Sequence, residues 1–388
     1  MRELHWTKAE AKDFMVKYHM INIKNQPAGT AGLKTVFDLL KSVQYDPLDV
    51  VGRNSDLVLQ SRIRNYKKEL LHKALYTERY LIDGWDKMMS IHRTKDFPYF
   101  SKIREYREQA ALDTFTARNI RHAVDYSEEI LAKIKENGPL YSREIELDNE
   151  EEARWKHGKL SSVTLDYLFN TGKIVVYNKT NAQKQFNLTE TVFNFEDVSL
   201  SDDEFTIWYL KRRISSMGLV WNRGGVNWSG MYISNKNTRT KYLKKLLKTE
   251  EVTKIHVEGI NYPLYALTES LDNASTIQNA ISFIAPLDNL IWDRELTSRL
   301  FNFDYRWEVY TPVKKRKYGY YVLPIMYKSD FIGRIEFKHH RKNNPLEVKN
   351  IWLEEGIKMN KTLERVLKTA LENFRKYLGA SHIEGLEI

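Results

Sequence analysis

The chain has 388 residues, a formal charge of +10 and a pI of about 9.2, so its length predicts two to four folded units and its charge favours a polyanionic partner. It contains no cysteine, which excludes disulfides, thiolate metal sites, iron–sulfur clusters and cysteine nucleophiles. Because no apolar run is long enough to span a bilayer and the first residues lack the apolar core of a signal peptide, we expect a cytoplasmic protein with no membrane partner.

Aromatic residues are frequent, with 23 Tyr, 16 Phe and 9 Trp beside 61 Lys and Arg. This mixture suits a nucleic acid, because cations contact phosphates while aromatic rings stack on bases or wedge between them. Aromatic cores beneath solvated charged faces would account for the same composition.

The first predicted elements are helical. Residues 7–20 begin with Thr7 and Glu10 at the spacing of a capping box, and apolar residues follow at helical intervals. A loop at 25–32 separates this helix from a second apolar helical face between Leu33 and Leu40.

A short strand or hairpin arm is predicted next, over Val43–Asp46. Apolar and polar residues alternate there, so Gln44 and Asp46 should share one face, and Pro47 should end the strand because it has no N–H to donate. A carboxylate beside a carboxamide on a stiff element can position and activate a water molecule. The same run is also typical of a turn in which the aspartate accepts a backbone N–H, so the local pattern leaves both interpretations open.

Helices followed by a strand pair then predict a first winged helix. These elements are expected at 54–64, with Asn54 or Ser55 as the cap, and at 66–76, 80–86 and 87–92.

A second winged helix is predicted from 123 onwards. Its first helix, 127–136, should stop at Asn137-Gly138-Pro139, because Gly accepts left-handed geometry and Pro cannot continue a helix. The strands of this unit flank a polar tip that carries Lys179 and Lys184. The remaining helices and strands are expected at 141–145, 160–170, 174–177 and 186–188.

The rest of the chain predicts a third winged helix and a C-terminal domain. The winged helix is expected to have helices at 204–217 and 235–248 and strands at 252–257 and 262–267. From Ser282 the sequence is rich in short β segments, including 318–325 and 331–337, before a mostly helical stretch at 351–376. We therefore predict an α+β protein with tandem winged helices, three in number, and a mixed C-terminal domain, divided at 1–122, 123–200, 201–272 and 273–388.

Motifs of several other enzyme classes are missing from the sequence. It has no phosphate-binding Gly-rich loop, no Gly-x-Ser-x-Gly elbow and no His-Glu-x-x-His pair. The adjacent His339 and His340 lie in the basic run Lys338–Lys342, which is more typical of a solvated turn than of a metal site. We expect neither a metal nor a cofactor.

Two long strings of residues carry a family resemblance. The first is Val43-Gln-Tyr-Asp-Pro-Leu48, followed by Arg53, Asp56-Leu57, Arg62 and Tyr66. The second is Ala285-Pro-Leu-Asp-Asn-Leu-Ile-Trp-Asp-Arg294, followed by Phe303-Asp-Tyr-Arg306, Glu308-Val-Tyr-Thr-Pro312, Lys315-Arg-Lys317 and Gly319-Tyr-Tyr-Val-Leu-Pro324. Over nearly its whole length the sequence closely resembles the YcaQ/AlkZ family of winged-helix DNA glycosylases, in its Gln-x-Asp (YcaQ-like) branch.

The resemblance implies hydrolysis of the N-glycosidic bond of N7-alkylated purines, including those in interstrand crosslinks, with Gln44 and Asp46 as the catalytic residues. One carboxylate suffices for this chemistry, because an N7-alkylated purine is already cationic and leaves without a second acid. No lysine stands out as an abasic-site lyase nucleophile, so we expect a monofunctional enzyme of base excision repair. We expect a nucleoid-associated monomer whose partner is double-stranded DNA carrying alkylated purines or crosslinks.

The predicted DNA contacts are cationic side chains, because phosphates supply most of the affinity for DNA. They are Arg53, Lys179, Lys184, Lys314, Lys315, Arg316 and Lys317.

Other charged residues of the two strings have alternative roles. Arg53 and Arg62 could pair with Asp49 or Asp56, or reach phosphates. Structural roles suit Asp288 and Asp293 better than catalysis, because carboxylates often cap turns or pair with arginines such as Arg294 and Arg306.

A non-catalytic winged-helix DNA-binding protein, such as a regulator or an architectural factor, would have the same charge and fold. Only Gln44 and Asp46 favour the enzyme over this alternative.

Overall fold

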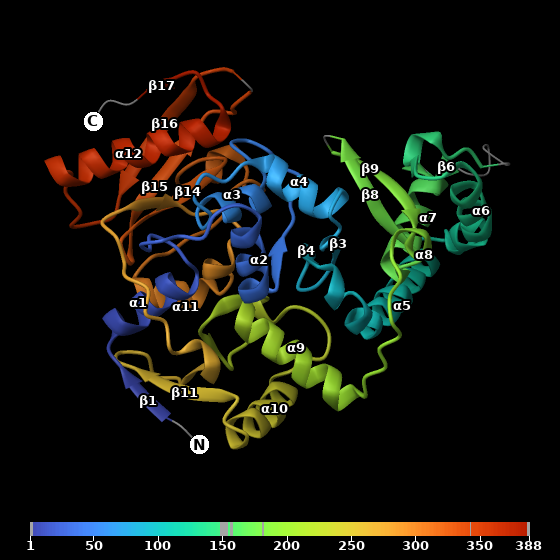
Figure 1. Ribbon diagram of the computed structural model, residues 1–388, viewed down its shortest axis with the longest axis horizontal. Helices are drawn as coiled ribbons and strands as arrows, with labels where there is room; N and C mark the ends of the chain where they lie inside the picture. Colours follow the sequence, from blue (N-terminus) through green and yellow to red (C-terminus); the bar gives the residue numbers. More distant parts are fainter. Residues whose placement is uncertain (1–2, 148–153, 156–157, 181, 342, 386–388) are drawn as a thin grey trace. The chain divides into compact units, whose positions relative to one another are not determined.

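The chain folds into a mixture of helices and sheets, seen in a computed structural model that describes residues 3–147, 154–155, 158–180, 182–341 and 343–385 (Figure 1). It divides into two compact units: unit 1 joins residues 1–71 to residues 206–388, and unit 2 is the segment 72–205 between them. The predicted α+β class is confirmed, while the number of winged helices and the domain boundaries given above stay predictions. Within the described ranges, no helix is long and apolar enough to cross a membrane.

Unit 1 begins with a short strand and a series of helices. Thr7 caps the first helix as predicted: its Oγ1 accepts the Glu10 N–H (3.2 Å), and Glu10 Oε2 accepts the Thr7 N–H (2.7 Å). The helix predicted from Asn54 ends at Gln60, and Arg53 precedes it as an N-cap without a side-chain bond, so neither proposed cap acts as one. The elements are β1 (Glu3–Trp6), α1 (Lys8–Tyr18), α2 (Gly29–Leu40), β2 (Ser42–Gln44), α3 (Asn54–Gln60) and α4 (Lys68–Tyr76), which runs on into unit 2.

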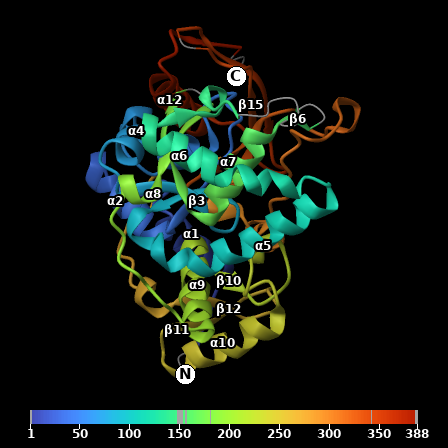
Figure 2. The same ribbon diagram turned by 90° about the vertical axis from the view of Figure 1, so that its right-hand side faces the viewer.

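A four-stranded sheet in the order β1-β11-β12-β10 joins the two sequence segments of unit 1. Strand β1 lies parallel to β11, whereas the other neighbours are antiparallel, and α10 lies beside β11 in both views (Figures 1 and 2). The helices and strands predicted here are confirmed, but the addition of β1 was not predicted. The elements are α9 (Asp202–Met217), β10 (Val220–Trp221), η5 (Val226–Trp228), α10 (Lys236–Lys248), β11 (Val252–Val257), β12 (Leu264–Leu267) and η6 (Thr268–Ser270).

The C-terminal part of unit 1 is a five-stranded sheet in the order β13-β14-β15-β16-β17, antiparallel except for the parallel pair β16–β17. Phe374 of α12 stacks on Phe283 and Phe337, so this helix packs on the sheet. The helical stretch predicted from Ile351 was placed too early, because β16 continues to Leu353. The elements are β13 (Ile281–Phe283), η7 (Asn289–Ile291), α11 (Arg294–Phe301), η8 (Val313–Lys315), β14 (Val322–Tyr327), β15 (Asp330–Phe337), β16 (Leu346–Leu353), α12 (Lys361–Leu378) and β17 (Ile383–Glu384).

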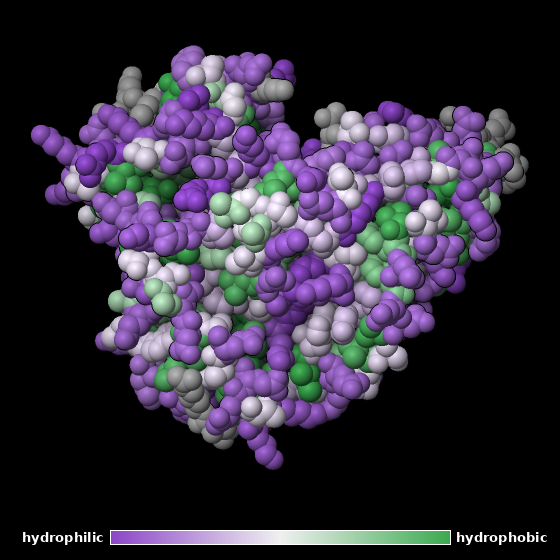
Figure 3. Space-filling view, in the orientation of Figure 1, coloured by the Kyte–Doolittle hydropathy of each residue, from purple (hydrophilic) through white to green (hydrophobic). Residues whose placement is uncertain are grey.

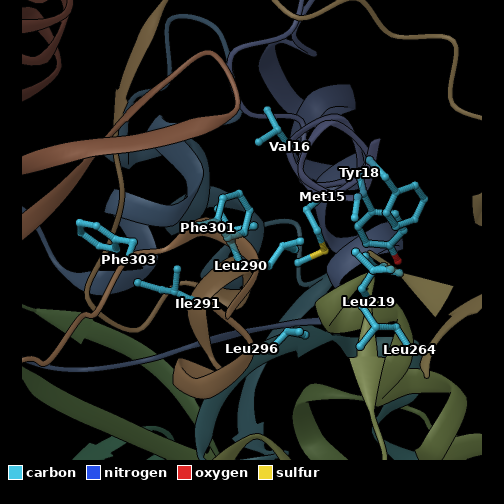
Figure 4. Close-up of a cluster of buried hydrophobic side chains, with 14 of the residues drawn as sticks. Met15, Val16, Tyr18, Leu219, Leu264, Leu290, Ile291, Leu296, Phe301 and Phe303 are labelled. Carbon is cyan, nitrogen blue, oxygen red and sulfur yellow. The ribbon is translucent and has the colours of Figure 1, made fainter. Parts of the chain in front are cut away.

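The main core of unit 1 forms between α1, the β10–β12 region and residues 284–305 (Figure 4). Each fully buried aliphatic or aromatic side chain there contributes roughly 1.5–3 kcal/mol of hydrophobic stabilisation. Hydrophilic side chains predominate on the outer face drawn in Figure 3, as a mean hydropathy of −0.55 leads one to expect. The labelled core residues are Met15, Val16, Tyr18, Leu219, Leu264, Leu290, Ile291, Leu296, Phe301 and Phe303.

Unit 2 contains an antiparallel strand pair, β3–β4, and a three-stranded sheet, β5-β9-β8, packed against helices. Gly138 ends α6 with a φ of +78°, as predicted. The helix predicted at 141–145 is instead a strand residue followed by a 3-10 turn. The elements are β3 (Leu81–Trp85), β4 (Met89–Arg93), η1 (Thr94–Asp96), η2 (Pro98–Phe100), α5 (Ser101–Ala117), η3 (Arg121–Tyr126), α6 (Ser127–Asn137), β5 (Leu140–Tyr141), η4 (Ser142–Glu144), β6 (Arg154–Trp155), β7 (Gly158–Lys159), α7 (Leu160–Thr171), β8 (Ile174–Thr180), β9 (Gln183–Leu188) and α8 (Thr189–Val192).

Candidate active site

The two candidate catalytic residues lie at the end of β2 and in the loop after it. Gln44 is the last residue of β2 and is 9% exposed, whereas Asp46 is half-buried in the loop. The prediction of a strand through Asp46 was therefore wrong. Asp46 Oδ1 instead accepts the Leu48 N–H across Pro47 (2.9 Å), which is the bond expected of an aspartate turn. This bond fixes the carboxylate, so the turn and catalytic interpretations are compatible.

The environment of Asp46 makes its carboxylate a good proton acceptor. Burial raises the pKa of Asp46, and the hydrogen bond from Leu48 opposes this only in part. Within the described part of the chain, no Lys or Arg forms an ion pair with Asp46. A raised pKa means a stronger base than a solvated aspartate, which suits a residue that activates water.

Two buried asparagines tie β2 to the second family string. Asn54 donates to the Gln44 carbonyl (2.8 Å) and accepts the Leu287 N–H at its Oδ1 (2.9 Å). Asn289 donates to the carbonyl of Ser42 (3.0 Å). Sequence reasoning gave Asn54 only as a helix cap and assigned no role to Asn289, although an asparagine beside an apolar run such as Leu290-Ile291-Trp292 signals a buried polar group that needs partners.

Helix α9 holds the C-terminal end of α2, from which β2 starts. The last carbonyls of a helix have no partner inside it. Here Ser215 Oγ donates to the Leu39 carbonyl (2.6 Å), and Ser216 Oγ to the Leu40 carbonyl (2.7 Å). Arg212 donates a further bond to the carbonyl of Lys41 (2.8 Å). Residues 39–41, which lead into β2, are therefore held by three side chains of α9.

A fully buried ion pair joins the two family strings directly. The Arg62 guanidinium donates to both oxygens of Asp288, at 2.8 and 2.6 Å, and neither side chain is exposed. His19 lies beside this pair, and burial together with the Arg62 charge lowers the pKa of His19 to about 4. The predicted structural role of Asp288 is confirmed, but its partner is Arg62 and not Arg294 or Arg306.

The loop after Asp46 contacts the C-terminal part of unit 1. His340 donates its backbone N–H to the Val50 carbonyl (2.8 Å), and the Tyr377 hydroxyl lies close to Gly52. At Gly52, where φ is +112°, an added Cβ would lie 2.5 Å from that hydroxyl, so only glycine fits. Asp49 accepts the Gly52 N–H (2.9 Å) and lies 4.0 Å from the Arg53 Nε.

Asp293 and Glu308 of the second string are also structural. Asp293 caps α11 through the Leu296 N–H (2.9 Å) and accepts the indole N–H of Trp221 (2.6 Å). Burial raises the pKa of Glu308, but backbone N–H groups, led by that of Lys317, lower it below its ordinary value. These carboxylates shape turns, as the sequence predicted for Asp293.

The candidate DNA contacts differ in exposure. Lys179 is in β8, which runs on to Thr180, and its ammonium forms a buried ion pair with Asp83 (2.6 Å); this placement does not favour the predicted phosphate contact. Lys184 is partly exposed above the Phe169 ring, and Arg53 is also partly exposed. In the basic run Lys314, Lys315 and Lys317 are exposed and Arg316 is partly exposed.

No group of three or more His, Asp or Glu side chains that could hold a metal ion occurs among the residues described by the structure. His339 is exposed and His340 is partly exposed, while Lys342 of the same basic run lies outside the described residues.

The chain is similar to a known family in its sequence and to a solved structure in its fold. A family model described as DNA glycosylase AlkZ-like matches residues 37–377, which include both family strings. The fold is similar to that of the Streptomyces sahachiroi DNA glycosylase AlkZ, with a TM-score of 0.64 at 16% sequence identity. That similarity covers 96% of this chain and 97% of the Streptomyces chain, so it extends over both units.

Proposed function

Because this chain belongs to the AlkZ-like DNA glycosylase family, we propose that it hydrolyses the N-glycosidic bond of N7-alkylated purines in duplex DNA, including those tied into interstrand crosslinks. The single observation that carries this proposal is Asp46, a half-buried carboxylate with a raised pKa, fixed by the Leu48 N–H in a loop that buried polar bonds support. We further propose that the enzyme is monofunctional and leaves an abasic site.

The proposed chemistry needs only one carboxylate. An N7-alkylated purine carries a positive charge and departs without protonation, so the enzyme has to stabilise an oxocarbenium-like sugar and deliver water. Asp46 can accept the proton of that water and oppose the developing positive charge. Gln44 would hold the water or the sugar by a hydrogen bond.

A crosslinked base cannot rotate far from the helix, because it remains tied to the opposite strand. The catalytic residues should therefore be carried to the duplex by contacts with its backbone. We propose Arg53, Lys184, Lys314, Lys315, Arg316 and Lys317 for these contacts, and leave out the buried Lys179.

The proposal is tested by the release of N7-methylguanine from a defined duplex, followed as abasic sites cleaved by alkali on a gel. Asp46→Asn should slow the single-turnover rate by at least roughly a hundredfold while changing duplex affinity little. Near wild-type excision by this variant would remove Asp46 from the mechanism. Binding without excision by the wild-type protein would indicate the non-catalytic DNA-binding alternative.

The leaving group provides a second test. If the enzyme only helps a purine that is already cationic, it should leave uracil and hypoxanthine in place, since their departure needs a proton or a tailored pocket. Excision of uracil at a comparable rate would contradict the one-carboxylate mechanism.

A further inference from the structure

Residues 308–320, here called the tip loop, carry three exposed large hydrophobic side chains, Tyr310, Val313 and Tyr320. Tyr310 is 84% exposed and Val313 is 74% exposed, and the loop connects α11 to β14. Single exposed hydrophobic residues are common on protein surfaces, but three of them on one short loop indicate a contact surface.

The tip loop is held in shape by its own hydrogen bonds. The Glu308 carboxylate accepts the backbone N–H groups of Lys317 (2.9 Å), Tyr318 (2.9 Å) and Gly319 (3.3 Å), and the Glu308 carbonyl accepts the Thr311 N–H (2.8 Å). Across the loop, Arg316 donates its Nε–H to the Thr311 carbonyl (2.9 Å). A loop fixed in this way presents its apolar tip without a large ordering cost on binding.

The base of the tip loop is connected through the core of unit 1 to residues 45–53, the loop that carries Asp46, here called the catalytic loop. Trp307 packs its ring edge-on against both Tyr310 and the buried Tyr321, at centroid distances of 5.9 and 6.0 Å. The Tyr305 hydroxyl donates to the carbonyl of Val322, next to Tyr321 (2.7 Å), and the Arg294 guanidinium lies 4.6 Å from the Tyr305 ring centre and donates to the Pro286 carbonyl (2.5 Å). Leu287, the next residue, donates its N–H to the Asn54 side chain, which in turn donates to the Gln44 carbonyl. Tip loop and catalytic loop therefore belong to the same part of unit 1.

The charge around the apolar tip identifies the kind of partner. Between residues 309 and 320 the sequence has four cations, at 314–317, and no Asp or Glu. Three of these cations, Lys314, Lys315 and Lys317, are exposed. Apolar and aromatic side chains flanked by cations match a duplex, whose phosphates lie outside a stack of apolar base faces.

We propose that Tyr310 and Val313 enter the duplex as a wedge beside the nucleotide attacked at Asp46, with the Tyr310 ring stacking on the base pair that the lesion leaves exposed. This wedge role rests on the proposed glycosylase function. Lys314, Lys315 and Lys317 hold the flanking phosphates, so affinity and base unstacking come from different side chains of one loop.

The experiment uses a duplex with a tetrahydrofuran abasic-site analogue and 2-aminopurine as its neighbour, because 2-aminopurine fluorescence rises when the base is unstacked. The wild-type protein should raise the signal, and Tyr310→Ala combined with Val313→Ala should abolish most of that rise. In the same variant, single-turnover release of N7-methylguanine should fall on the order of tenfold, as expected for loss of one stacking contact. Affinity for undamaged duplex should change less than about threefold, since the phosphate-binding cations remain.

Three variants control this experiment. Tyr310→Phe retains the ring and should behave as wild type. Tyr262→Ala removes a 47% exposed tyrosine from another surface of unit 1 and should also change nothing. Lys314→Ala combined with Lys315→Ala should show the reverse pattern, with weaker binding and an unchanged fluorescence rise at saturating protein.

An unchanged fluorescence rise and excision rate in the Tyr310→Ala, Val313→Ala variant would overturn the wedge. Tyr310-dependent binding to vesicles of anionic phospholipid, with unchanged 2-aminopurine fluorescence and excision, would also overturn the wedge. It would indicate that the tip loop binds a membrane surface. The fluorescence is read on a duplex that cannot be hydrolysed. A wild-type protein that unstacks 2-aminopurine through Tyr310 but releases no N7-methylguanine would therefore contradict the proposed function and leave the wedge standing.

Discussion

Gln44 and Asp46 divide the proposed catalytic work unequally. Asp46 bears the charge that opposes the cationic transition state, whereas Gln44 is a buried neutral side chain that can only orient its partner by hydrogen bonds. Substitution of Asp46 should therefore slow the reaction more than substitution of Gln44.

Gln44→Ala should slow release of N7-methylguanine less than Asp46→Asn does. Removal of one orienting hydrogen bond costs roughly 1–3 kcal/mol, and the carboxylate stays in place. Single-turnover rates at saturating enzyme measure both losses on the same duplex. A larger loss for Gln44→Ala would mean that the carboxamide, and not the carboxylate, carries the chemistry.

Asp56 allows a prediction about stability and pH. Burial raises its pKa to about 6 in the folded protein, although the Tyr66 hydroxyl, which donates to Asp56 (2.8 Å), lowers it. A folded-state pKa above the unfolded value of 3.8 means that the contribution of Asp56 to stability is present below pH 3.8 and is lost as pH rises through about 6. At neutral pH the buried carboxylate therefore makes no such contribution.

Asp56→Asn, which stays neutral and can still accept the Tyr66 bond, should gain stability relative to wild type as pH rises from about 4 to about 6. The gain should reach at most about 3 kcal/mol, because one pKa unit corresponds to about 1.4 kcal/mol. Denaturant unfolding of both proteins across this range measures it. His19 titrates with the opposite sign in both proteins and cancels, so a pH-independent difference would speak against the raised pKa.

Candidate catalytic residues are easier to identify from the sequence than the buried residues that hold them in place. Gln44 and Asp46 stand in a recognisable string, whereas Arg62 and Asp288 are 226 positions apart, and closer carboxylates were the expected partners of Arg62. Lys179 was predicted in a polar tip because the apolar run ends at Tyr177. Its strand continues on backbone hydrogen bonds, which an apolar pattern does not report.

Among the elements, β2 depends most on bonds from distant segments. Asn54→Ala would leave the buried Gln44 carbonyl without its partner, at a cost of roughly 1–3 kcal/mol, and would also remove the partner of the part-buried Leu287 N–H. Because β2 leads into the catalytic loop, excision should fall more than the loss of stability explains.

Asn22→Ala is the matched control for Asn54→Ala. Asn22 is equally buried and donates to the carbonyls of Met326 (3.2 Å) and Lys328 (3.1 Å), away from β2. Thermal unfolding should show a loss for Asn22→Ala at least as large as that for Asn54→Ala, because Asn22 also has a φ of +49° that alanine adopts only with strain. Single-turnover excision at a temperature where both variants are folded should fall only for Asn54→Ala. Equal excision rates for the two variants would show that the bonds of Asn54 to β2 are not needed for catalysis.

Elements with strong local signals could be predicted from the sequence. The capping box predicted the start of α1, the glycine predicted the end of α6, and the strand predicted at 252–257 matches β11. β1 gave no such signal, because four residues are too few for a pattern and its partner strand is remote. Residues 351–353 were taken into a helix for the same reason, since a strand end and a helix start differ little over three residues.

For the whole molecule, the charge of +10 predicts DNA binding that weakens steeply with salt, because each phosphate neutralised releases counterions. Affinity for undamaged duplex should fall by orders of magnitude between low and moderate salt, as measured by fluorescence anisotropy. Each alanine at Lys314 or Lys315 should reduce the slope of log affinity against log salt by about 1. A slope near zero would show that the positive charge serves another partner.

Because unit 2 separates the two sequence segments of unit 1, unit 1 cannot fold completely until the whole chain has been synthesised. Synthesis proceeds from the N-terminus and domains fold as units, so residues 72–205 can fold while the partners of residues 1–71 are still unmade. Arg62 has to wait for Asp288, and β1 for β11. A chain truncated after Met217 should accordingly protect residues 72–205 from protease and leave the segment around Asp46 open to cleavage. We therefore expect the loop that carries Asp46 to be synthesised early and to reach its folded position only after residues 255–288 have been made.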